Sequence, residues 1–198
     1  VELIYACVWI GAVIVPLNVR WSAIENRDAL EDCRARVLIV DRAFAELGAE
    51  IAADVHGLAL VYADTGETPS GMVAWERLAT ASDPIPDAMR KAGDLAGIFY
   101  TGGTTGRSKG VMLSHGNLTA NAFNALAEGL FDASCTYLHA APMFHLANGA
   151  AMVSLLMSGG SNRMIRAFSP DAVLSAIQDE KITDVLLVPT MIQMLVDH

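Results

Sequence analysis

The chain has few cysteines, few charged residues and no apolar run long enough to cross a membrane. Its three cysteines, Cys7, Cys33 and Cys135, are odd in number and widely spaced. Such a set predicts neither a disulfide framework nor a metal site, and favours a reduced, cytoplasmic compartment. The apolar stretch over residues 3–17 contains Pro16, lacks a basic leader and is shorter than the roughly 20 residues that a spanning helix needs. We therefore expect no integral membrane segment.

Charged residues make up only 18% of the chain, whereas hydrophobic residues make up 53%. Acidic side chains outnumber basic ones by 22 to 13, which gives a formal net charge of −9. An acidic surface repels phosphate backbones, so we expect no nucleic acid as a partner. The apolar excess predicts a layered core in which many side chains are buried.

Helical and strand patterns alternate along the chain and predict an α/β fold. Short apolar runs that end at polar residues are typical of buried parallel strands, and the amphipathic stretches between them are typical of helices. Repeated strand–helix–strand units favour a layered α/β/α architecture with a mostly parallel sheet flanked by helices. We expect helices over residues 3–12, 23–33, 44–54, 116–130, 150–157 and 170–181, a short helix near Trp75, and strands over residues 13–17, 37–40, 58–62, 95–99, 110–114, 136–140, 163–166 and 185–188.

Residues 100–111 have the composition of a phosphate-binding loop. They read Tyr-Thr-Gly-Gly-Thr-Thr-Gly-Arg-Ser-Lys-Gly-Val and lie where one predicted strand ends and another begins. Glycines let the backbone turn and expose its amide hydrogens, threonine hydroxyls add short donors, and a lysine adds a full positive charge. These groups together suit a polyphosphate.

Two familiar nucleotide motifs do not fit this loop. A Walker A loop has four residues between its glycine and a Gly-Lys-Ser/Thr triplet, but counting from Gly102 or Gly103 reaches Arg107 or Ser108. The dinucleotide pattern Gly-x-Gly-x-x-Gly is not met either. Because residues 110–114 have the pattern of a strand, we expect the loop to join two strands.

The loop resembles the phosphate-binding signature of the adenylate-forming superfamily, which includes acyl-CoA synthetases, luciferases and peptide-synthetase adenylation domains. The family pattern is aromatic-Thr-Ser/Gly-Gly-Thr-Thr-Gly-x-x-Lys-Gly-Val, and residues 100–111 match it at every specified position. Residues 12–18, 37–41 and 188–192 are also similar to family segments, in the family's order. The resemblance therefore extends over nearly the whole chain.

A second similarity to this family is Pro-Met-Phe-His at residues 142–145, directly after the predicted strand 136–140. By itself, a histidine among apolar neighbours is typical of a packed core side chain. The motif recurs in acyl-CoA synthetases, however, and the resemblance implies that His145 lies near the reacting carboxylate and the acyl pocket. Some long-chain members have a tryptophan gate four residues later, where this chain has Gly149. The residues around that position are all small or modest and leave room for a substrate: Ala147, Asn148, Gly149 and Ala150.

The other internal histidines are interpreted as structural. We expect His56 in a surface turn, His115 at a helix start and His139 late in a strand. No pair of carboxylates in the sequence has a spacing that indicates acid–base work.

The resemblance implies an ATP-dependent carboxylic acid–CoA ligase. The carboxylate attacks the α-phosphate of ATP to give an acyl-adenylate and pyrophosphate, and the thiol of coenzyme A then displaces AMP. Lys109 would neutralise charge on the departing pyrophosphate, Thr101 would help to ligate a bridging Mg²⁺, and His145 would position the carboxylate or gate the thiol. The implied catalytic residues are thus Lys109 and His145. The implied phosphate-binding residues are Thr101, Gly102, Gly103, Thr104, Thr105, Gly106 and Lys109.

The later family motifs, which bind adenine and ribose and supply a C-terminal lysine, are not found in residues 1–198. The resemblance therefore implies an incomplete N-terminal AMP-binding domain without its C-terminal domain, inactive by itself. A peptide-synthetase adenylation domain is one alternative, and a non-catalytic nucleotide-binding module is another. The expected ligands are ATP, Mg²⁺, coenzyme A and a fatty or aromatic carboxylic acid.

Overall fold

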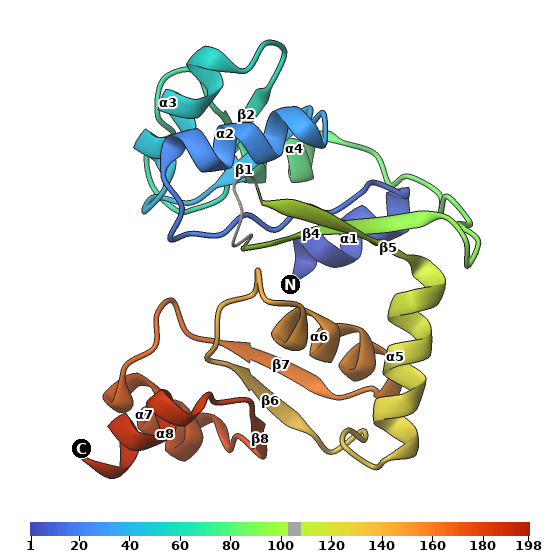
Figure 1. Cartoon of the computed structure of the whole chain (residues 1–198), viewed down its shortest axis with the longest axis vertical. Helices are drawn as coiled ribbons and strands as arrows, with labels where there is room; N and C mark the ends of the chain where they lie inside the picture. The colour runs from blue at the N-terminus through green and yellow to red at the C-terminus, as the bar shows by residue number, and fades with distance from the viewer. Residues whose placement is uncertain (103–107) are drawn as a thin grey trace. The chain divides into compact units, whose positions relative to one another are not determined.

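The computed structural model of the chain describes residues 1–102 and 108–198 (Figure 1). These residues divide into two compact units, each of which is described by itself. Unit 1 consists of Val1–Pro16, Ala88–Phe99 and Met112–His198, and unit 2 consists of Leu17–Asp87 and Tyr100–Val111. Among the described residues, none of the helices combines the length and the apolar character that crossing a membrane requires.

Unit 2 is built on a parallel sheet with the strand order β1-β2-β3. Its elements are α2 (Ala23–Asp32), β1 (Val37–Val40), α3 (Ala45–Asp54), β2 (Ala59–Tyr62), β3 (Val73–Ala74) and α4 (Trp75–Ala81). Successive side chains of a strand point to opposite faces, and in β1 it is Leu38 and Val40 that are buried. They pack with Leu30 of α2 and with Ile51 and Val55 at the end of α3. These apolar contacts hold both helices against the sheet.

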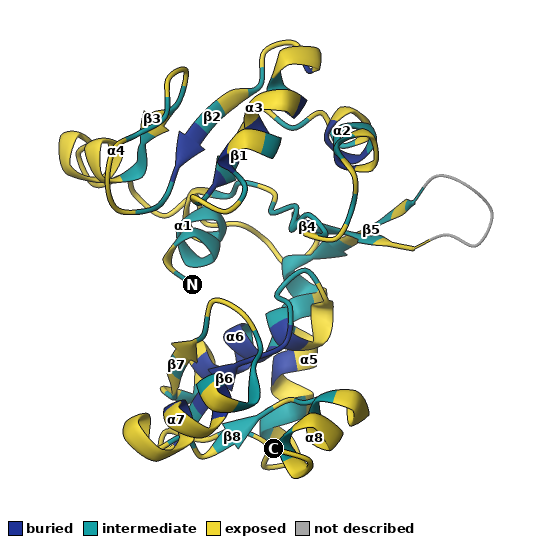
Figure 2. Ribbon diagram, turned by 90° about the vertical axis from the view of Figure 1, so that its left-hand side faces the viewer, coloured by how far each residue is buried: buried dark blue, intermediate teal, exposed yellow. Residues whose placement is uncertain are grey.

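Unit 1 is built on a second parallel sheet, β7-β6-β8, with β6 in the centre. Its elements are α1 (Glu2–Ile10), α5 (His115–Ala127), β6 (Thr136–His139), α6 (Leu146–Ser158), β7 (Ser161–Met164), α7 (Pro170–Glu180), β8 (Asp184–Val185) and α8 (Pro189–Val196). Tyr137 of β6 packs with Leu155 of α6, whereas the next residue, Leu138, packs with Val173 of α7. Because neighbouring strand residues face opposite ways, α6 and α7 cover opposite faces of the sheet. Figure 2 shows the buried residues along β6 and α6.

A two-stranded sheet of β4 (Leu95–Thr101) and β5 (Lys109–Ser114) carries the ends of the candidate loop. Both strands contribute residues to unit 1 and to unit 2. In β4, Gly97 also makes a single parallel bridge to Ile14. After β5 the chain enters α5 directly, where Ser114 and Asn117 form a capping box that satisfies the first amides of the helix.

The α/β fold and its parallel strands confirm the class predicted from the sequence, with differences at particular ends. The predicted strand over residues 13–17 is only the bridge at Ile14, whose N–H donates to Ala96 and whose carbonyl accepts from Ile98. The next bond of this ladder would need an N–H at Pro16, which proline lacks. The predicted strand over 185–188 likewise ends at Val185, because Pro189 already opens α8.

Two further differences concern α6 and α7. Helix α6 begins at Leu146, four residues before the predicted start, so the residue just before it is His145. The apolar pattern of residues 170–181 predicts that Val173, Leu174 and Ile177 are buried. In α7, Val173 is buried, but Leu174 and Ile177 are 44% and 38% exposed.

Candidate functional site

The described base of the candidate loop consists of the last residue of β4, the first residues of β5 and Gly102. Thr101 and Lys109 end and begin the two strands, and the side chains of both are exposed. The hydroxyl of Thr101 donates to the carbonyl oxygen of Lys109 over 3.4 Å, a long bond that leaves the hydroxyl oxygen free to accept or to ligate. A Cβ added at Gly102 would meet no atom within 4 Å, so the backbone is open there.

The remaining loop positions lie outside the described residues. They are Gly103, Thr104, Thr105, Gly106 and Arg107. The predicted phosphate contacts of the first four therefore stay predictions. What the structure shows is that the predicted strands on both sides of the loop are present, as β4 and β5.

Tyr100 anchors the loop base to the end of α2. Its hydroxyl lies 2.6 Å from the carboxylate of Asp32 and 3.1 Å from the carbonyl oxygen of Ala29, so one proton is shared between two acceptors. Its ring meets the ring of Trp21 edge-on, with the centroids 6.3 Å apart. Burial, together with the hydrogen bond to Asp32, raises the pKa of Tyr100 above its usual range. The phenol therefore stays a neutral donor.

This anchoring role was missed by sequence reasoning, which assigned Tyr100 only to the aromatic position of the loop signature. Asp32 lies 68 residues away along the chain, and no local pattern pairs it with Tyr100. The only usable signal was that an aromatic residue with a hydroxyl stands directly before Thr101.

His145 is the residue from which α6 starts. It is the N-cap residue, with φ −83° and ψ 126°, and its side chain makes no capping hydrogen bond. The imidazole is exposed and lies against the ring of Phe144, with the centroids 4.4 Å apart. An exposed imidazole that is not used for capping is available to a ligand.

A buried polar cluster contacts the segment that leads to His145. Sequence reasoning also missed this cluster. Its centre is Asn148, only 1% exposed, whose amide contacts Ala141, Tyr137 and His139. Sequence reasoning took Asn148 as one of several modest side chains that leave room for a substrate, but the structure buries it among hydrogen-bond partners. His139 does lie late in a strand as predicted, yet it is 2% exposed and hydrogen-bonded at both ring nitrogens.

The predicted site residues fall into two groups. Thr101, Gly102 and Lys109 belong to unit 2, where the hydrogen bond from Thr101 to Lys109 brings the two strand ends together. His145 belongs to unit 1. Within residues 1–102 and 108–198, no cluster of three or more His, Cys, Asp or Glu side chains could hold a metal ion.

The comparisons with known proteins give the class of this chain. Its sequence matches the family of AMP-binding enzymes over residues 1–198, and the chain belongs to that family. The resemblance to the adenylate-forming superfamily is thereby confirmed over the full length.

Similar proteins include a CoA synthase and a CoA ligase. The chain is similar to the feruloyl-CoA synthase of Amycolatopsis sp, with 40% identity over 198 residues that cover 100% of this chain and 38% of the relative. It is also similar to the indoleacetate–CoA ligase of Aromatoleum aromaticum, with 34% identity over 199 residues that cover 98% of this chain and 38% of the relative. The chain thus spans 38% of the length of each of these proteins.

Solved structures share the fold of this chain. ATP-bound MatB from Rhodopseudomonas palustris superposes with a TM-score of 0.81 at 30% identity, covering 99% of this chain and 38% of that one. A long-chain-fatty-acid-CoA ligase, FadD1 from Archaeoglobus fulgidus, gives a TM-score of 0.86 at 28% identity, covering 98% of this chain and 38% of that one. These similarities confirm the fold class predicted from the sequence.

Proposed function

We propose that the protein containing this chain is an ATP-dependent carboxylic acid–CoA ligase. The observation that carries the proposal is the complete phosphate-loop signature at residues 100–111, held between β4 and β5. The signature lies in a chain that is 40% identical to a feruloyl-CoA synthase over all 198 residues of the chain. These named relatives favour a CoA ligase over a peptide-synthetase adenylation domain, and the relatives that act on aromatic acids favour an aromatic carboxylate as the substrate.

The loop would act by placing donors and positive charge around the phosphates of ATP. A free carboxylate is a poor acyl donor, so it must be joined to AMP with loss of pyrophosphate before a thiol can displace the AMP. Lys109, exposed at the start of β5, would neutralise the charge that builds on the pyrophosphate. The hydroxyl of Thr101 and the open backbone at Gly102 would approach the phosphates directly. We extend this role to Gly103, Thr104, Thr105 and Gly106 as a prediction.

The described residues fit a Mg²⁺ ion that is held mainly by the phosphates. They supply no cluster of three or more metal-ligating side chains, and Mg²⁺ in nucleotide sites commonly takes few protein ligands besides the phosphates and water. The Thr101 hydroxyl, whose hydrogen bond to Lys109 is long, is the described group that would serve as a ligand. When bound, the ion neutralises phosphate charge and orients the phosphate groups.

His145 would serve the carboxylate end of the reaction. Its imidazole is exposed at the start of α6 and makes no capping hydrogen bond. It can therefore hydrogen-bond a carboxylate or control the approach of the thiol. The chain spans 38% of the length of the feruloyl-CoA synthase. Coenzyme A and the acid would be bound by the full-length protein.

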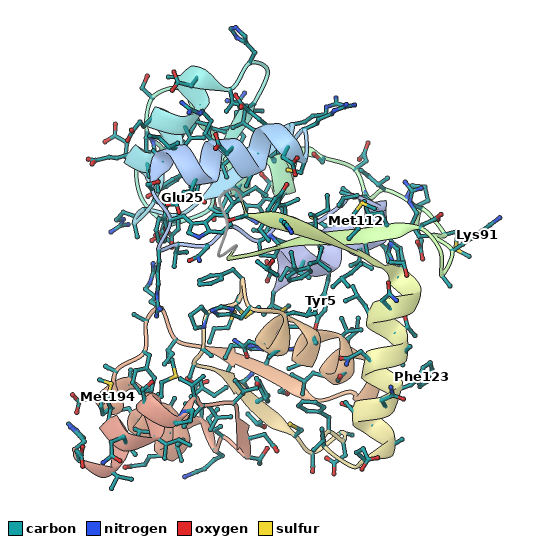
Figure 3. All side chains as sticks on the ribbon, viewed as in Figure 1. Tyr5, Glu25, Lys91, Met112, Phe123 and Met194 are labelled. Atoms are coloured by element: carbon teal, nitrogen blue, oxygen red, sulfur yellow. The ribbon has the colours of Figure 1, made fainter. Side chains whose placement is uncertain are left out.

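The test is formation of CoA thioester by the full-length protein with ferulate, indoleacetate and a long-chain fatty acid. Lys109→Ala should lower kcat/KM about 100-fold or more, the scale of losing one preorganised electrostatic donor. Lys91→Ala, an exposed lysine outside the loop (labelled in Figure 3), is the matched control and should have no effect. His145→Ala should weaken the reaction, whereas His56→Ala, in an exposed turn, should not. Binding of ATP without a thioester from any acid would favour the non-catalytic alternative.

A further inference from the structure

Asn148 hydrogen-bonds to both ends of the segment that carries His145, through its side chain at Ala141 and its backbone N–H at His145. Asn148 lies in the first turn of α6, and its amide nitrogen donates to the carbonyl oxygen of Ala141 over 2.6 Å and to the sulfur of Met143 over 3.5 Å. Its backbone N–H donates to the carbonyl of His145 over 3.1 Å. One residue thus contacts both ends of the segment 141–145.

The orientation of this amide is fixed by its partners. The carbonyl of Ala141 can only accept, so the NH₂ group of Asn148 must face it, and the amide oxygen must face β6. That oxygen accepts from the hydroxyl of Tyr137 over 3.2 Å and lies 3.1 Å from Nδ1 of His139. His139 therefore carries a proton on Nδ1. With two donors and two acceptor positions in use, the buried amide is fully satisfied.

Further contacts hold His139 at its other ring nitrogen. Its Nε2 lies 2.7 Å from the amide oxygen of Asn162 on β7. The Asn162 nitrogen lies 3.4 Å from the hydroxyl of Tyr5 on α1, which donates to the carbonyl of Met152 in α6 over 2.9 Å (Tyr5 is labelled in Figure 3). Burial lowers the pKa of His139, and the hydrogen bonds to Asn162 and Asn148 oppose this shift. This series of hydrogen bonds therefore runs from Asn148 to Met152, both of which lie in α6.

Among residues 1–102 and 108–198, few backbone hydrogen bonds define the segment between Ala141 and α6. Its own hydrogen bond, from the N–H of His145 to the carbonyl of Pro142, is 3.3 Å long and correspondingly weak. A leucine at position 148 would have the same branching, with somewhat larger methyl groups, and would avoid the cost of burying an amide. The donors of Asn148 are both directed at residues 141 and 143, the part of the chain that leads to His145.

We propose that Asn148 is a positioning residue of the acyl site, which sets the backbone of residues 141–145 and so presents the imidazole of His145. This inference rests on the proposed function, which gives His145 its role. Tyr137 and His139 keep the Asn148 amide turned toward Ala141. Loss of Asn148 then weakens use of the carboxylic acid and leaves use of ATP unchanged.

Two substitutions separate positioning from packing. Asn148→Leu keeps the branched shape, with somewhat larger methyl groups, and removes the four side-chain hydrogen bonds. Asn148→Asp keeps the shape but places a carboxylate oxygen against the carbonyl of Ala141. Once neutral, that carboxyl group has one O–H to donate to Ala141 and one oxygen to accept from Tyr137. Burial raises the pKa of such a group, so N148D should regain function as the pH falls through this raised value. Ser154→Ala is the matched control, since Ser154 is also in α6 and 1% exposed.

The first readout is the KM for the acid and for ATP, measured separately on the full-length protein. We expect N148L to raise the acid KM about tenfold or more, the scale of leaving buried partners unsatisfied, and to keep the ATP KM within about twofold. N148D should match N148L at high pH and approach the wild type at low pH, while S154A should match the wild type throughout. An acid KM that N148L leaves unchanged, or an equal rise in both KM values, overturns the proposal.

The second readout is hydrogen exchange of the backbone amides at residues 143–149, which needs no activity. N148L should exchange faster there than the wild type, while the later turns of α6 keep their protection and S154A stays unchanged. Unchanged exchange at 143–149 overturns the positioning role, whether or not the protein is a ligase. Faster exchange in N148L, combined with a wild-type protein that makes no thioester, would instead keep the positioning role and refute the proposed function.

Discussion

Replacing Tyr100 with phenylalanine removes the hydroxyl that ties the loop base to α2 and leaves the ring in place. The two acceptors it loses are the carboxylate of Asp32, 2.6 Å away, and the carbonyl of Ala29, 3.1 Å away. The ring contact with Trp21 needs no hydroxyl and should persist. The substitution therefore tests the anchor rather than the packing.

The magnitude follows from where the partners lie. A hydrogen bond to a charged group contributes about 1.5–3 kcal/mol, but the carboxylate of Asp32 is exposed and water replaces part of the loss. We therefore expect a net cost of about 1 kcal/mol in the stability of the anchored arrangement. Because Thr101 follows Tyr100 directly, a similar cost in ATP binding would raise the ATP KM by a factor of about 5.

The assay is a double-mutant cycle on the full-length protein with Y100F, Asp32→Asn and the pair, read as the KM for ATP. The single changes should each raise it, and the pair should raise it less than the product of the two, because both remove the same bond. Glu31→Gln, the neighbouring exposed acid, is the control and should have no effect. Strictly additive effects, or an ATP KM that Y100F leaves unchanged, would refute the reasoning.

Three further predictions concern the scaffold. Burial, then the hydrogen bond to Asp184, raises the pKa of Cys135 to about 11, so it should resist iodoacetamide at pH 8 in the native protein and react once unfolded, as mass spectrometry would show. Ser22→Ala should lower Tm by about 2–4 °C through loss of the capping box with Glu25, and an unchanged thermal transition would argue against that cap. Burial lowers the pKa of His139 below its usual 6.5, so the unfolded chain binds more protons there and the free energy of unfolding should fall as the pH drops below about 6.5; denaturant titrations of His139→Gln should show a flatter dependence.

Local patterns were enough to predict much of this fold. The four apolar residues of β1 and the amphipathic pattern of α2 act within one strand or one helix, so their outcome depends little on distant residues. The loop signature likewise lies in one continuous segment, and both strands beside it are present. Prolines indicate where strands end. Pro16 shortens the strand predicted over residues 13–17 further than the apolar pattern alone indicates.

What the sequence could not predict are contacts between distant residues. The partner of Tyr100 lies 68 residues away, and the cluster around His139 draws on α1, β6, α6 and β7. Neither Asn148 nor Gly149 favours a helix interior, so propensity placed the start of α6 too late, whereas hydrogen bonds and burial of Asn148 start the helix at Leu146. Tertiary contacts therefore decide the position of His145.

The measurement that tests the central claim most directly is acid-dependent exchange of labelled pyrophosphate into ATP by the full-length protein, without coenzyme A. Our account predicts exchange with an aromatic carboxylic acid, a loss of about 100-fold in Lys109→Ala and normal exchange in Lys91→Ala. ATP binding without exchange for any acid, or full exchange in Lys109→Ala, would contradict it.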